Sequence, residues 1–297
     1  MTPGEAGFLL LTSKLGNPDR KTLTTAQLRT MGERVKAMSR PETDRELETG
    51  DLIALGYGPD MARRILALLE EKDVLAYYLN RGRKMGCTPI SRVSQEYPRW
   101  LKEKLGLEAP GCLWAKGDLA LLKTPMVSLV GSRDLHPENK RFAAEVGRQA
   151  ALQGYTLVSG NARGADRTAQ NACLRAGGSV ISIVADELSR QPLLERVLYL
   201  SEDGFDEEFS AQRALSRNRC IHTLGCKTFV AQSSLNHGGT WDGSVKNLRQ
   251  GWSPVFCYDD GSEAAGQLIQ MGAESVGFTE LSGLESLQRT EQNIFDR

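Results

Sequence analysis

From Met126 onward the chain alternates short apolar segments with amphipathic ones, and this alternation constrains its fold more than any other feature. Segments typical of buried strands lie at 126–131, 155–159, 179–184, 197–200, 228–231 and 255–258. Helical patterns lie between them, at about 137–153, 160–176, 211–224, 241–249 and 263–271. Strands that are apolar throughout and alternate with helices form parallel sheets covered on both faces. We therefore predict an α/β fold with a doubly wound, mostly parallel, Rossmann-like sheet.

The first 80 residues have a helical pattern without strands. Met61, Ile65 and Leu68 share one face of a predicted helix, and the turn Leu55-Gly56-Tyr57-Gly58-Pro59 leads into it. This is the pattern of a helix-hairpin-helix, which serves either as a structural hairpin or as a holder of a DNA phosphate on its turn amides. We predict a small all-helical domain (helix-hairpin-helix or SAM-like) over 1–80, a connector and the start of the second domain over 81–125, and the Rossmann-like domain over 126–297.

Charge and apolar content limit the classes of protein. Lys plus Arg and Asp plus Glu both number 37, so global charge does not hold this chain on nucleic acid, although a local basic patch remains open. The sequence contains no apolar run of the ~18–20 residues that a membrane span needs. Its six cysteines contain no CxxC pair, and we expect no secretory signal. We expect a cytoplasmic protein with reduced thiols and no membrane partner.

Three segments carry unusual sets of glycine, arginine and small polar residues, two of them between a predicted strand and its helix and the third, Arg217-Asn218-Arg219, within or beside a helix. Glycine permits a close approach to the backbone, a helix start presents free N–H groups, and arginine offers a fork to phosphate. Because ligands bind beyond the carboxyl ends of parallel strands, we predict that these segments converge on one phosphate site. The candidate residues are Gly131, Ser132, Arg133, Ser159, Gly160, Arg163, Gly164, Asp166, Arg217, Asn218 and Arg219.

Several familiar chemistries have no motif here. The dinucleotide pattern GxGxxG and the P-loop GxxxxGK[ST] are both missing from the sequence, which argues against an NAD-dependent dehydrogenase and a P-loop ATPase. The three histidines lack metal-ligand spacing with the cysteines, and no GxSxG nucleophile motif occurs. We expect no catalytic residue, no metal and no cofactor. Trp241 and Trp252 are expected in the core, with base stacking as the alternative.

Several motifs follow one another in a fixed order over about residues 85–260. They are Tyr97-Pro98-Arg99-Trp100-Leu101, Leu113-Trp114-Ala115-Lys116-Gly117-Asp118, Val130-Gly131-Ser132-Arg133, Ser159-Gly-Asn-Ala-Arg-Gly-Ala-Asp166, Gly177-Gly178 and Ser216-Arg-Asn-Arg-Cys-Ile221. Together they resemble the motifs of the DprA/Smf family of DNA-processing proteins. The resemblance implies a homodimer that binds single-stranded DNA and loads the RecA recombinase onto it during natural transformation. It also implies that Arg133 contacts a backbone phosphate, that Ser159, Gly160, Arg163 and Gly164 line the pocket, and that Arg217 and Arg219 add positive charge.

The chain departs from the family pattern in the segment 234–244. Its Gly238-Gly239-Thr240 core resembles the phosphate loop of the lysine-decarboxylase-like (LOG) nucleotide hydrolases and joins the candidate site. An alternative function therefore stays open. The chain could be a sensor or hydrolase that binds a nucleotide or phosphoribosyl ligand, with Asp166 or Glu187 as the general acid or base. We expect Asp166 instead to cap a helix or to pair with Arg163 or Arg133. The sequence ends about 25 residues after its last predicted helix, so we expect a divergent family member without a C-terminal winged helix.

Overall fold

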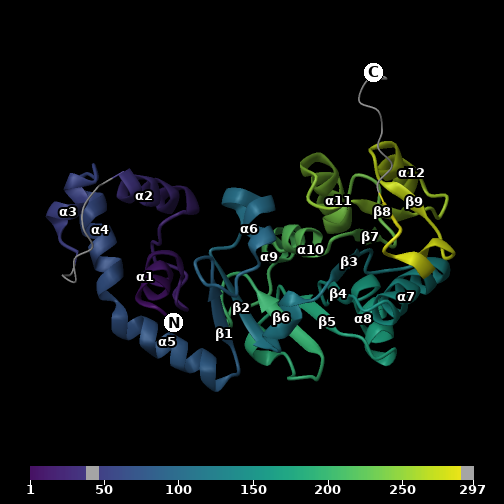
Figure 1. The fold of residues 1–297 in the computed structure, drawn as a ribbon, viewed down its shortest axis with the longest axis horizontal. Helices are drawn as coiled ribbons and strands as arrows, with labels where there is room; N and C mark the ends of the chain where they lie inside the picture. Colours follow the sequence, from purple (N-terminus) through teal and green to yellow (C-terminus); the bar gives the residue numbers. More distant parts are fainter. Residues whose placement is uncertain (38–46, 289–297) are drawn as a thin grey trace.

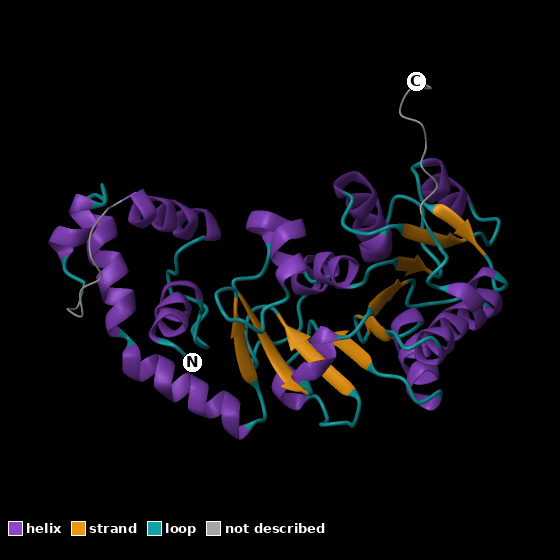
Figure 2. Ribbon diagram, in the orientation of Figure 1, coloured by secondary structure: helices purple, strands orange, loops and turns teal. Residues whose placement is uncertain are grey.

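A mostly parallel sheet forms the centre of the molecule in the computed structural model, which describes residues 1–37 and 47–288 (Figures 1 and 2). The strands are β1 (Thr88–Ser91), β2 (Cys112–Gly117), β3 (Met126–Val130), β4 (Thr156–Ser159), β5 (Val180–Ile183), β6 (Val197–Ser201), β7 (Thr228–Val230), β8 (Val255–Tyr258) and β9 (Glu274–Val276). The helices are α1 (Pro3–Thr12), α2 (Thr25–Ala37), α3 (Thr49–Ala54), α4 (Pro59–Glu70), α5 (Lys72–Lys84), α6 (Arg99–Leu105), α7 (Pro137–Leu152), α8 (Ala165–Arg175), α9 (Ala211–Ser216), α10 (Asn218–Leu224), α11 (Gly238–Gln250) and α12 (Glu263–Gln270). Short 3-10 turns follow α6 (Gly106–Glu108), β2 (Leu119–Lys123), β5 (Leu188–Arg190) and β9 (Glu280–Gly283).

The order of the strands places a ligand-binding position at the middle of the sheet. The order is β1-β2-β6-β5-β4-β3-β7-β8-β9, with antiparallel pairing only where β1 meets β2 and β2 meets β6 in the described chain. From β3 the chain winds outward through β4, β5 and β6, then returns to the other side of β3 as β7. The winding direction therefore changes between β3 and β7, and the loops after these two strands diverge there. Open α/β sheets bind ligands at such a point.

Each strand buries one set of side chains on each face of the sheet. On β3, Val127 and Leu129 pack with Phe142 and Val146 of α7, whereas Val130 faces the core under α6, α10 and α11. Phe142, Val146 and Ala150 recur every four residues and therefore form a single stripe along α7. The two faces thus have separate apolar cores, as expected for a sheet covered on both sides.

The N-terminal helices contact the antiparallel edge of the sheet. Tyr78 of α5 meets Trp114 of β2 and Phe205, with ring centroids 5.3 and 4.6 Å away. Helix α5 continues from α4 toward β1 in Figure 1. In the predicted helical hairpin, α3 and α4 flank the turn at 55–58, where Arg34 Nη1 donates to the Gly56 carbonyl at 3.0 Å. An arginine side chain therefore lies against this turn and binds one of its carbonyl oxygens.

The predicted fold class and the six predicted strands are confirmed, but other predictions need correction. Strands β1, β2 and β9 were not predicted, and β1 and β2 lie in the segment treated as a connector. The single helix predicted over 211–224 is wrong, because it is divided at Arg217 into α9 and α10. Helix α11 begins at Gly238 rather than at 241. Within the described residues, no helix has the length and apolar character needed to cross a membrane.

Candidate functional site

A cavity of about 540 Å³ opens at the position where the winding of the sheet changes direction. Its walls come from the loop after β3, the loop after β7, the break between α9 and α10, and the first turn of α11. Segments that lie up to about one hundred residues apart in the sequence therefore meet here. The predicted site residues that line this cavity are Gly131, Ser132, Arg133, Asp166, Arg217, Asn218, Gly238, Gly239 and Thr240.

Arg217 is the buried cation of this cavity. It stands at the junction of α9 and α10, and only 8% of its side chain is exposed. Its Nε and Nη1 atoms are buried and find no hydrogen-bond partner among the described residues. Its Nη2 lies 4.0 Å from an Asp166 carboxylate oxygen, too far for a hydrogen bond. Leaving guanidinium donors buried and unpaired is costly, so this geometry favours an anion that supplies the missing acceptors.

Asp166 orders the loop after β4. One of its oxygens accepts the backbone N–H groups of Gly160 and Ala162, both at 3.1 Å. Burial raises the pKa of the Asp166 carboxyl, while Arg217 and the two N–H groups oppose that shift. Asp166 was expected to cap a helix or to pair with Arg163 or Arg133. Its hydrogen bonds go instead to two loop N–H groups that precede α8, and Arg217 rather than Arg163 is the arginine that approaches it to 4.0 Å. With this oxygen committed to the loop, Asp166 has a structural role in the cavity.

Two glycines allow the surrounding loops to approach closely. A Cβ atom at Gly160 would lie 1.5 Å from Nη1 of Arg217, so only glycine leaves space for the buried guanidinium. Gly164 has a φ of +87°, and a Cβ atom there would lie 2.4 Å from the carbonyl oxygens of Ser132 and Arg133. Neither glycine lines the cavity. Both are needed for the shape of its wall.

Arg133 supplies the exposed cation at the mouth of the cavity. It follows β3 directly and is largely accessible to solvent. No ion pair or hydrogen bond of its side chain occurs within the described ranges of the chain. Arg133 lies near enough to Asp166 to lower the pKa of that carboxyl. An incoming anion would therefore meet one accessible and one buried arginine.

Helix α11 directs its N-terminus at the same space. Its N-cap residue, His237, makes no side-chain capping hydrogen bond in the described structure, so the first-turn N–H groups stay available to an anion. Asn218 Nδ2 donates to the Gly239 carbonyl at 3.0 Å and fixes this turn against α10. Ser233, which was not predicted, also lines the cavity, and its hydroxyl is buried without a partner among the described residues. Its place just after β7 is the signal that could have identified it.

Two polar residues predicted at the site lie outside the cavity. Ser159 is fully buried, and its hydroxyl accepts a hydrogen bond from Gln170 Nε2 at 2.6 Å. Arg163 is exposed and pairs with Asp134 at 2.7 Å. Both side chains are thus engaged with other residues of the loops that surround the cavity.

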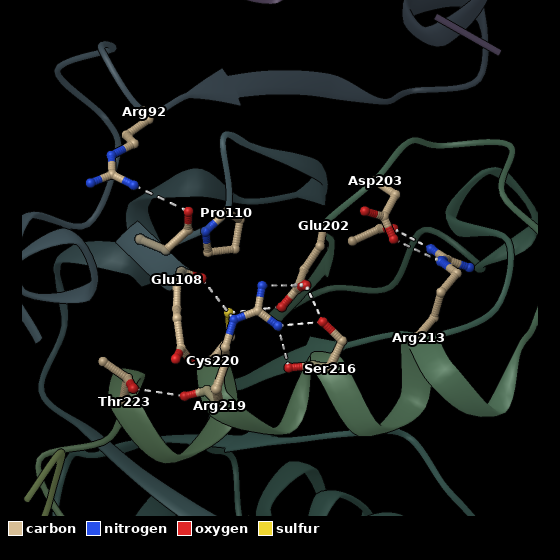
Figure 3. Close-up of polar contacts among 12 residues, drawn as sticks. Arg92, Glu108, Pro110, Glu202, Asp203, Arg213, Ser216, Arg219, Cys220 and Thr223 are labelled. Atoms are coloured by element: carbon tan, nitrogen blue, oxygen red, sulfur yellow. Dashed lines mark hydrogen bonds and ion pairs between the residues drawn. The ribbon is translucent and has the colours of Figure 1, made fainter. Parts of the chain in front are cut away.

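Arg219 points away from this cavity, contrary to its predicted position. Its guanidinium pairs with Glu202 at 2.9 Å and donates to the Glu108 carbonyl at 2.8 Å and to Ser216. Figure 3 shows this guanidinium between Glu202 and Ser216, beside the Cys220 thiol that donates to Glu202 at 2.9 Å. Residues two apart on a helix do not share a face, so Arg217 and Arg219 cannot both enter one cavity.

A family model described as DNA recombination-mediator protein A matches residues 88–283, which include every cavity-lining segment. The chain belongs to the DNA recombination-mediator protein A family. The resemblance to DprA/Smf proteins is thereby confirmed.

Individual members of this family give the same result. DNA processing protein DprA of Bacillus subtilis is 28% identical over 218 residues, which cover 68% of this chain and 71% of that protein. DprA of Streptococcus pneumoniae is 31% identical over 182 residues, covering 57% of this chain and 64% of the relative. Protein Smf of Escherichia coli is 30% identical, and the match covers 55% of this chain but only 48% of that protein.

Solved structures of the DNA recombination-mediator protein A family share the fold. The X-ray structure of S. pneumoniae DprA aligns with a TM-score of 0.69 at 24% identity, covering 93% of this chain and 95% of that one. A structure that describes the single-stranded DNA binding mode of Helicobacter pylori DprA aligns with a TM-score of 0.56 at 22% identity, covering 66% and 94%. The described residues of this family member contain no group of three or more His, Cys, Asp or Glu side chains arranged for a metal ion.

Proposed function

We propose that this chain binds single-stranded DNA and holds a backbone phosphate in the cavity between Arg133 and Arg217. The observation that carries the proposal is the Arg217 guanidinium, buried with two nitrogen atoms that lack a hydrogen-bond partner among the described residues. A phosphate offers several acceptor oxygens, and arginine binds it in a fork. The first turn of α11 adds backbone N–H groups at the same place.

The charge balance of the chain fits a local binding site. With a formal net charge of zero, attraction to the strand must come from the arginines at the cavity rather than from the whole surface. Phosphate contacts position a nucleic acid without reading its sequence. Binding that depends on them weakens as salt increases, because counterions compete for the strand.

The wider biological role rests on the relatives. The matched proteins are named DNA processing proteins, and the H. pylori protein binds single-stranded DNA. We propose that this chain likewise processes and protects internalised DNA, loads RecA in the cytoplasm, and works as a homodimer. We further propose that residues 1–80 form the helical domain and that 126–297, with strands from 81–125, form the DNA-binding domain.

We propose a binding protein rather than an enzyme. In the alternative reading, a nucleotide hydrolase would use Asp166 or Glu187 as acid–base. Asp166 accepts two backbone hydrogen bonds beside Arg217, which suits it to order the loop. Glu187 pairs with Arg190 at 2.7 Å and lies outside the cavity wall. Neither contact pattern favours proton transfer to a ligand in the cavity.

The test is fluorescence anisotropy of a labelled oligo(dT) at two salt concentrations, with the wild type and the Arg133→Ala variant. We expect salt-sensitive binding that Arg133→Ala weakens by about tenfold, the loss of one charged hydrogen bond. Arg148→Ala is the matched control, because Arg148 pairs with Glu145 on α7 outside the cavity, and we expect wild-type affinity. If the wild type does not bind at low salt, the proposed function is wrong.

A further inference from the structure

A second cavity, of about 850 Å³, adjoins the cavity that Arg133 and Arg217 line. Leu215, Asn218 and Gly239 line both, so these three residues form a ridge that separates them. Gly239 adds no side chain to this ridge, and Asn218 donates to the Gly239 carbonyl at 3.0 Å. Because the two cavities share these residues, a ligand anchored in one of them lies directly beside the other. The volume lies in the range of roughly 300–1,000 Å³ that small-molecule sites have.

The charged side chains around the second cavity neutralise one another, with one exception. Glu202 pairs with Arg219 at 2.9 Å and Glu108 with Lys246 at 2.7 Å. Asp203 likewise pairs with Arg213 at 3.1 Å. Asp242 of α11 is exposed, and its carboxylate has no hydrogen bond or ion pair to any described residue. A phosphate would be repelled by this free carboxylate, so the second cavity does not suit a further phosphate.

Large apolar side chains form part of the remaining wall. Leu107 and Leu215 line it with 43% and 51% of their surface exposed, although both are large apolar residues. The buried indole of Trp252 contributes to the same wall, with Lys246 Nζ 5.5 Å from its ring centroid. A flat, neutral group with hydrogen-bond donors on its edge matches exposed apolar side chains next to one unpaired carboxylate. Nucleobases have this chemistry.

We propose that the second cavity binds a nucleobase of the strand whose phosphate occupies the first cavity, and that Asp242 makes it prefer guanine. This inference rests on the proposed function. The Watson–Crick edge of guanine carries two adjacent donors, N1–H and the N2 amino group, which a carboxylate accepts with its two oxygens. Thymine has a single imide donor, and adenine and cytosine each have an amino group beside an acceptor. The Asp242 carboxylate is thus a specificity-determining group for the strand.

The experiment compares affinities for oligonucleotides of equal length: oligo(dT), an alternating dT-dG repeat, and the same repeat with inosine in place of guanine. Inosine lacks the N2 amino group and keeps N1–H. A lithium buffer prevents quadruplexes. We expect the wild type to bind the guanine repeat about tenfold more tightly than the other two, the worth of one hydrogen bond to a charged group.

The Asp242→Asn variant identifies the residue. It should keep the wild-type affinity for oligo(dT) and lose the preference for guanine, since an amide replaces one acceptor oxygen by a donor. Glu263→Gln removes the same charge from exposed Glu263, outside both cavities, and should retain the preference. Equal wild-type affinity for all three strands, or a preference that survives in Asp242→Asn, overturns this inference and leaves the proposed function standing. Failure to bind any strand removes the proposed function itself.

Discussion

Replacing Arg217 by methionine isolates the contribution of the buried guanidinium to DNA binding. Methionine has a similar length and no charge, and Asp166 keeps its two backbone hydrogen bonds at 3.1 Å. In the wild type, the Nε and Nη1 atoms of Arg217 have no hydrogen-bond partner among the described residues, and we propose that phosphate oxygens bind them. A hydrogen bond to a charged group contributes about 1.5–3 kcal/mol, so one such bond lost lowers affinity by about ten- to a hundredfold.

The assay is a salt titration of oligo(dT) affinity for the wild type and Arg217→Met. Each phosphate neutralised on a single strand contributes about 0.7 to the slope of log K against log salt, so the variant's slope should be shallower by about that amount. Arg148→Ala, which removes an exposed arginine from α7, should leave the slope unchanged. Circular dichroism checks that the variants are folded. If folded Arg217→Met retains both the affinity and the slope of the wild type, no phosphate binds the guanidinium.

Three further predictions concern the cavity wall and the core. Gly160→Ala places a Cβ atom 1.5 Å from the Arg217 guanidinium and must displace it. Anisotropy should then show an affinity for oligo(dT) about tenfold weaker, with the protein still folded. Unchanged affinity would mean that the guanidinium does not contribute to DNA binding. Arg219→Ala leaves the buried Glu202 without its cation and should lower the free energy of unfolding, measured in urea, by about 3 kcal/mol. Arg163→Ala removes an exposed ion pair and should lower it by less than about 1 kcal/mol. Equal losses in the two variants would contradict the structural role of the Arg219–Glu202 pair. Burial lowers the pKa of His222 from 6.5 to about 3. As the pH falls below 6.5, the imidazole therefore binds a proton in the unfolded chain but not in the folded one. The free energy of unfolding falls as a result, by about 1.4 kcal/mol per pH unit from this group, until the pH approaches 3. His222→Gln should reduce that slope in urea unfolding at pH 4–6, and an unreduced slope would assign it to other groups.

The sequence predicts those parts of the fold that depend on local pattern. Strands β3 to β8 are mostly apolar and were found to within about two residues at each end. The interior strand β2 is also largely apolar but lies in the segment treated as a connector, so it was not found. The edge strands carry polar residues, as in Thr88-Pro89-Ile90-Ser91 and Glu274-Ser275-Val276, and their pairing is decided by neighbours distant in the chain. Their strand conformation therefore depends on tertiary contacts, and the local sequence pattern does not predict it.

The candidate site divides in the same way. The rule that parallel strands end at one edge correctly predicts that the loops after β3 and β4 and the segment around Arg217 meet. It does not predict which way a side chain points. Arg219 turns to Glu202, seventeen residues earlier in the chain, because that carboxylate at the end of β6 is buried beside it. Ser233 was not predicted because the unusual motif in the loop after β7 begins one residue later, at residue 234.

The central claim is that a single strand binds at the point where the sheet changes its winding direction, and hydrogen exchange with and without oligo(dT) tests it most directly. The first-turn N–H groups of α11 have no intrahelical partner, so a bound phosphate should protect them. We predict slower exchange at 131–133 and 237–241, with little change in α7, which lies on the other face of the sheet. Binding that leaves 131–133 and 237–241 unprotected, and protects the N-terminal helices instead, would contradict the account.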